Sequence, residues 1–146
     1  MRRTFRNAVL ILSVGAFVVS SAGLARAGDD AYAWQLFHAT NRSRTSHGVH
    51  RVDRAFRMSK VAERHSQRMA EHRRLWHTSG PTLYGAHCYA WGENVGWTSG
   101  DIPDIERAFM ASAGHRTHIL DGSFDRVGVG AAKVGGKLWV TVFFCT

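Results

Sequence analysis

The sequence has little cysteine and little proline: two of each in 146 residues. Its cysteines, Cys88 and Cys145, are too far apart to form a CxxC or CxxH pair, so a thiolate zinc site is not expected. No G-x-S-x-G segment occurs, so the usual nucleophile signature of serine hydrolases is missing. Repeats, linkers and low-complexity tracts are also absent, which favours one ordinary globular domain.

Long apolar runs are absent except near the start. The run from Ala8 to Val19 follows three arginines and precedes the small-x-small tripeptide Ala25-Arg26-Ala27. This arrangement predicts a secretory signal peptide over residues 1–27, because the run is too short for a comfortable membrane span. The alternative is an uncleaved N-terminal anchor. Cleavage would leave residues 28–146 as a single domain.

Acidic residues are scarce relative to basic ones, but half of the imbalance belongs to the predicted signal. The 19 basic residues less the four arginines before Gly28 leave 15 against 11 acidic residues, a net charge of +4. This value argues little for nucleic acid as a partner. We therefore expect a protein that is secreted, extracellular or in the cell envelope, monomeric, and without a transmembrane segment after cleavage.

The two cysteines both lie in the expected mature chain. Export makes an oxidising compartment plausible, where an even pair indicates a disulfide. Such a bond between Cys88 and Cys145 would close a long loop and contribute on the order of 4 kcal/mol. The alternative is two buried free thiols.

Three helices are expected from the hydrophobic spacing. The first follows Asp29 and Asp30 and ends at Gly48, and the third begins at the N-cap residue Asp101 and ends at Gly114. The second begins near Asp53. One apolar stripe runs along it, with the spacing of a helix, and consists of Met58, Val61, Ala62, His65 and Met69.

The other faces of the second helix carry a run of basic residues. The favoured interpretation is a solvated surface, and the alternative is a surface that binds anionic polymers. These residues are Arg54, Arg57, Lys60, Arg64 and Arg68.

Regular periodicity fades between Leu75 and Gly100, which predicts a structured loop region with a short strand around Cys88 to Ala90. Its aromatic residues are interpreted as core rather than as the lining of a groove for an apolar or sugar ligand. They are Trp76, Tyr89, Trp91 and Trp97.

The C-terminus changes to a period of two. Alternation from Val127, the dipeptide Gly135-Gly136 and an apolar run from Leu138 to Phe144 predict a β-hairpin. Small residues at 128, 130 and 132 indicate that a helix packs closely on that face. Helices first and strands last give an α+β fold class with an antiparallel sheet.

Several motifs together resemble the CAP superfamily of cysteine-rich secretory proteins, antigen 5 and plant pathogenesis-related proteins. The set covers essentially the whole mature chain, and its order is highly specific. It comprises Asn41-x-x-Arg44-x-x-x-Gly48, Met58-x-x-x-Ala62-x-x-His65-Ser66, His77-Thr78-Ser79-Gly80, Gly92-Glu93-Asn94-Val95-Gly96-Trp97, Ser112-x-Gly114-His115-Arg116 and Val127-Gly128-Val129-Gly130.

The resemblance implies an α-β-α sandwich, with a small antiparallel sheet between helical layers. It also implies a central cleft, onto which His77, Glu93 and His115 map. The second cleft glutamate of animal and plant members is replaced by Ser112, and Glu106 lies one or two helical turns before that position. Two further positions depart from the bacterial pattern: His118 stands where asparagine is usual, and Val142 where many have glutamine.

Two imidazoles and one carboxylate suit a divalent cation, zinc above all, so the metal ligands expected are His77, Glu93 and His115. The alternative is a hydrogen-bonded cluster without metal. His65 is expected in the core. The remaining histidines before Tyr89 are expected on the surface, namely His38, His47, His50, His72 and His87.

The function that the resemblance favours is a secreted, non-catalytic binding module. The ligand classes it implies are a lipid or sterol, a cell-surface component, or another protein. The alternative is a metal-dependent hydrolase, a protease or nuclease, in which a cation in the same cleft activates water. The fold does not decide between them.

Overall fold

The computed structural model describes residues 21–78 and 87–146, with side chains from Gly28 onward. Residues 1–20 of the expected signal lie outside the described residues, so cleavage stays a prediction. The elements are α1 (Ser21–Ser46), β1 (Asp53–Arg54), α2 (Phe56–His72), β2 (Trp91–Thr98), α3 (Ile102–Ala111), α4 (Ala113–Leu120), β3 (Arg126–Val134) and β4 (Lys137–Cys145).

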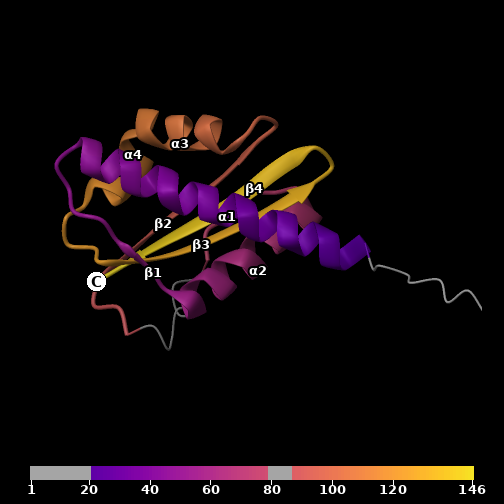
Figure 1. Cartoon of the computed structure of the whole chain (residues 1–146), viewed down its shortest axis with the longest axis horizontal. Coiled ribbons are helices and arrows are strands. Elements are labelled where there is room, and N and C mark those ends of the chain that lie inside the picture. The colour runs from indigo at the N-terminus through magenta and orange to yellow at the C-terminus, as the bar shows by residue number, and fades with distance from the viewer. Residues whose placement is uncertain (1–20, 79–86) are drawn as a thin grey trace, which may run out of the picture.

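The four strands form one sheet in the order β1-β3-β4-β2. The β3–β4 and β4–β2 pairs are antiparallel, and the two-residue β1 adds to β3 in parallel. The sheet lies between α2 on one side and α1, α3 and α4 on the other (Figure 1). The expected α-β-α sandwich is confirmed, and the short parallel strand makes its sheet mixed.

Each face of the sheet has its own core. Leu36 of α1 and Phe109 of α3 pack with Val129 and Val140 on one face. On the other face, α2 comes so close that an ideal Cβ on Gly130 would lie 2.1 Å from the backbone nitrogen of Glu63. Only glycine permits this approach. The predicted close packing of a helix on the small residues of β3 is therefore confirmed.

The turn between β3 and β4 and the N-cap of α3 form where the sequence predicts them. Gly135 and Gly136 adopt φ values of +58° and +75° between β3 and β4, a region that favours glycine. Asp101 caps α3 through a reciprocal capping box with Asp104. The hairpin and the start of the third helix are confirmed.

Three helix boundaries differ from those expected. The first helix begins at Ser21, because the alanine-rich stretch before Asp29 also favours helix. The second begins at Phe56, because residues 53–54 pair with β3 instead. The third ends at Ala111, and Gly114 lies inside the first turn of a separate helix, α4.

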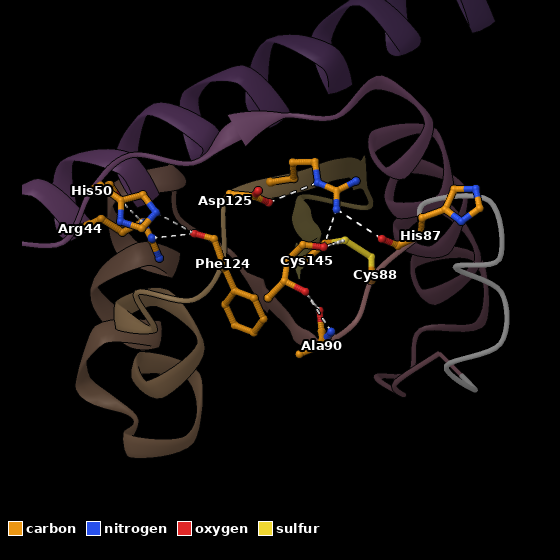
Figure 2. A network of polar contacts seen from close by, with 10 residues as sticks. Arg44, His50, His87, Cys88, Ala90, Phe124, Asp125 and Cys145 are labelled. Atoms are coloured by element: carbon orange, nitrogen blue, oxygen red, sulfur yellow. Dashed lines mark hydrogen bonds and ion pairs between the residues drawn. A yellow bond between two sulfur atoms is a disulfide. The ribbon is translucent and has the colours of Figure 1, made fainter.

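The expected disulfide between Cys88 and Cys145 is present and closes a separation of 57 residues (Figure 2). It joins the end of β4 to the segment before β2. Arg126 reinforces this junction through Asp125 and through the carbonyls of His87 and Thr146. The start of β2 is therefore fixed from two sides.

The fully buried Arg44 connects α1 to the segments around α4. Its guanidinium donates to the carbonyls of His50, Ile119, Asp121 and Phe124 at 2.7–3.1 Å. Figure 2 shows the contacts with His50 and Phe124. Because these carbonyls come from the loop after α1 and from the end of α4 and the loop that follows it, one side chain fixes the position of α4. Within the described residues, none of the helices has the length and apolar character needed to cross a membrane.

Candidate functional site

The candidate site is built on β2, the edge strand beside β4. The segment from Leu75 to Gly100 was expected to be mainly loop, and this is wrong for Trp91–Thr98, which pairs with β4 along eight residues. Successive side chains of a strand point to opposite faces. Glu93 therefore faces the α2 layer, while Asn94 faces α4.

The buried carboxylate of Glu93 is bonded to the exposed imidazole of His77. Its Oε2 lies 2.7 Å from Nδ1 of His77, and the Thr78 N–H donates to both carboxylate oxygens at 3.0 and 3.2 Å. The Glu93 side chain is 2% exposed, whereas that of His77 is 61% exposed. A carboxylate beside Nδ1 favours the proton there, so neutral His77 has its lone pair on Nε2.

His65 lies behind this pair, fully buried, as expected of a core histidine. Its Nε2 donates to the Trp76 carbonyl at 2.7 Å and lies 3.9 Å from the Glu93 carboxylate. Burial lowers the pKa of His65 despite the opposing effects of these two neighbours. The sequence did not predict that His65 lies near Glu93. The related signal was the helical spacing on α2, which placed His65 in the core.

His115 and His118 approach β2 from α4. The Asn94 side chain donates to the His115 carbonyl at 3.0 Å and accepts from Nδ1 of His118 at 2.8 Å. Burial is the largest cause of the lowered pKa of His115, and the charges of His77 and His118 lower it further. The surroundings of His115 therefore favour the neutral form of its imidazole.

The structure brings two of the three expected site residues into direct contact and ties the third to a neighbouring residue. His77 and Glu93 are directly bonded, while the backbone of His115 is tied to the neighbouring Asn94. In residues 21–78 and 87–146, no three His, Cys, Asp or Glu side chains form a ready metal-binding group. The donor chemistry still suits zinc, because neutral imidazoles keep a lone pair available. The metal role of these residues stays a prediction.

Glu106 does not supply the second cleft carboxylate. It is buried and accepts from Ser43 Oγ at 2.6 Å and from Thr40 Oγ1 at 3.1 Å, both on α1. Its partners therefore lie in the helical layer rather than beside His77. Ser112, at the position of that family glutamate, joins α3 to α4.

The aromatic residues around β2 are exposed, and their interpretation as core is wrong for three of them. Tyr89, Trp91 and Trp97 are 99%, 44% and 41% exposed. Trp91 and Trp97 share the parity of Glu93 along β2, so they flank it on one face. Only the half-buried Trp76, whose ring lies 5.3 Å from His65, behaves as expected. The five histidines expected on the surface are indeed exposed.

Helices on both faces of a small sheet, with a histidine–glutamate pair at its edge strand, define the α-β-α sandwich class that the motifs indicated. Residues 37–146 match the family model described as the CAP, cysteine-rich secretory protein family. The chain therefore belongs to the CAP family.

The chain is also similar to individual bacterial proteins. It is 29% identical over 122 residues to the uncharacterized protein YkwD of Bacillus subtilis, covering 77% of this chain and 47% of that protein. An extracellular SCP-domain protein of Bacillus anthracis gives a TM-score of 0.72 at 22% identity, over 83% of this chain and 42% of that one. An outer surface protein of Borrelia burgdorferi gives 0.68 at 16% identity, over 76% and 89%. The chain spans less than half the length of both Bacillus proteins.

Proposed function

We propose that this CAP domain is an extracellular binding module whose cleft, formed by His77, Glu93 and His115, takes a divalent cation. The observation that carries the proposal is the buried Glu93 carboxylate bonded to the exposed His77 imidazole. A structural ion pair has no need of an exposed partner, whereas a ligand site does. Export is supported by the predicted signal peptide and by two similar proteins described as extracellular or outer-surface.

Zinc is the cation that the side chains suit best. His77 and His115 would hold it through ring nitrogens, and Glu93 would orient His77 as carboxylates commonly do behind metal-bound histidines. This division of roles follows from the contact between Glu93 and Nδ1 of His77, which leaves Nε2 for the metal. Bound zinc would supply an open coordination position for a ligand.

Two features favour binding over hydrolysis. A general base must reach a water molecule, but Glu93 is 2% exposed and accepts from both His77 and Thr78. The other candidate carboxylate, Glu106, is bonded to α1. The exposed Trp91 and Trp97 beside Glu93 offer contact area for an apolar ligand or a sugar face.

Calorimetric titration of the mature protein with zinc tests the proposal. His77→Ala with His115→Ala should abolish binding, while the protein stays folded by circular dichroism. The matched control is His38→Ala with His47→Ala, which removes two exposed histidines, one on α1 and one just after it, in the helical layer across the sheet from the face of Glu93, and should leave binding intact. Unchanged binding in the first double variant contradicts the site. Peptide or nucleic-acid hydrolysis that stops on chelation would favour the hydrolase instead.

A further inference from the structure

The outer face of α2 carries a row of cations that the proposed cleft does not use. We call Arg57, Lys60, Arg64 and Arg68 the basic stripe. All four are exposed, and their spacing of three or four residues places them in one line along the helix. The line is about 16 Å long, at 1.5 Å per residue, with neighbouring charges about 5–6 Å apart along the axis.

The basic stripe points directly away from the sheet. The buried residues of α2, including Met58, Ala62 and Met69, face β3 and β4. The stripe therefore lies on the opposite side of the helix, and α2 forms the outer layer on this face of the sheet (Figure 1). None of its side chains is needed to attach α2 to the fold.

The charges of the stripe are largely uncompensated. Lys60 pairs with Glu63 at 2.9 Å, but across the described part of the chain Arg57, Arg64 and Arg68 have no acidic partner within ion-pair distance. Only Glu71, one turn beyond Arg68, adds an exposed negative charge to the same line. A row of this kind attracts an anion that carries several charges in sequence.

We propose that the basic stripe binds a linear anionic polysaccharide. Arginine makes up three of its four cations, and its planar fork suits sulfate, phosphate and carboxylate groups. A lipid surface is disfavoured because Phe56, at the start of α2 beside Lys60, is the one large apolar side chain that this helix exposes, whereas insertion needs an apolar face along the helix. Polysaccharide is chosen over nucleic acid because two similar proteins are described as extracellular or outer-surface.

The test measures binding of a fluorescent heparin oligosaccharide to the mature chain by anisotropy. With about 0.7 counterion released per contact, as for single-stranded polyanions, four contacts predict a loss on the order of 50-fold between about 50 and about 200 mM salt. Arg64→Glu with Arg68→Glu should weaken binding at least about tenfold and flatten the salt dependence. Glu71→Lys should tighten binding, because it extends the stripe.

The matched control is Arg42→Glu with Arg107→Glu, which makes the same change in net charge on α1 and α3, across the sheet. It should alter affinity by no more than about twofold, as expected of residues outside the interface. Equal losses in both double variants, or binding indifferent to salt, would overturn the proposal. Tighter binding to a DNA duplex or to anionic vesicles than to heparin would overturn the choice of polysaccharide. Zinc binding at His77 is a separate readout and should not change.

Discussion

Glu93 and Glu106 are the same residue type, and both are nearly inaccessible, at 3% and 6% exposed. Glu106 is held by the hydroxyls of Ser43 and Thr40 on a helix packed against it. Glu93 is held by a backbone N–H and by the exposed imidazole of His77. Burial alone therefore does not separate a scaffold residue from a site residue. What separates them is how far a partner of the buried group extends into solvent: the His77 side chain is 61% exposed, whereas Thr40 is buried and Ser43 is half-buried.

The pKa shifts of Glu106 and His115 differ between these two regions as well. Burial is the main cause of the raised pKa of Glu106, opposed by its bonds to Ser43 and Thr40. Near β2, burial lowers the pKa of His115, so its neutral, metal-competent form is favoured. The buried polar contacts in the layer of α1, α3 and α4 thus hold these helices together. At the edge strand β2, by contrast, imidazoles remain available to a ligand.

The largest expected effect concerns the buried polar contacts of the helical layer. Arg44→Met should lower the free energy of unfolding by roughly 5 kcal/mol, because it leaves four carbonyls without their donor, at about 1–3 kcal/mol for each group that stays buried. Urea denaturation measures the loss. The exposed Arg42→Met is the control and should change stability by less than about 0.5 kcal/mol. Similar small losses in both variants would show that Arg44 does not hold α4.

The next effect concerns the junction before β2. Cys145→Ser should lower the free energy of unfolding by about 4 kcal/mol, because the disulfide closes a separation of 57 residues. Wild-type protein under reducing conditions should show a similar loss in thermal or urea unfolding. If reduction leaves the midpoint unchanged, the bond does not contribute to stability.

A smaller expected effect is the pH dependence that Glu106 gives to the free energy of unfolding. Its pKa is higher in the folded than in the unfolded protein, so its contribution is fully present below the unfolded pKa and is lost as pH rises through the folded pKa. Glu106→Gln keeps an acceptor for the hydroxyls and removes this loss. Relative to wild type, the variant should therefore gain stability between acid and neutral pH, by about 1.4 kcal/mol per tenfold change in the acid constant. A constant difference across that range would contradict a raised pKa.

Much of the fold could be predicted because its signals are local. The Gly135-Gly136 turn, the Asp101 cap and the apolar stripe of α2 each depend on neighbours in sequence. β2 was missed because its glycines at 92 and 96 weaken the alternation that indicates a strand, and pairing with β4 decides its conformation. The two-residue β1 gives no periodic signal at all.

The site was predictable only in part. Motif order singled out His77 and Glu93, whose side chains are bonded in the structure, but no local pattern distinguishes Glu93 from Glu106, which bonds to α1. The contact of His118 with Asn94 across two elements was likewise invisible in the sequence. Exposure of Trp91 and Trp97 follows from β2 lying at the edge of the sheet, which depends on the complete strand order.

The most direct measurement compares the zinc affinities of Glu93→Gln and Glu106→Gln by calorimetry. The Glu93→Gln amide can donate to Nδ1 of His77, which favours the proton on Nε2 and removes the lone pair meant for the metal. We predict zinc binding about 10–100-fold weaker in Glu93→Gln, the usual cost of losing a residue that orients a metal ligand, and unchanged in Glu106→Gln. Equal affinities in Glu93→Gln and wild type would contradict the assignment of Glu93 to an open ligand site.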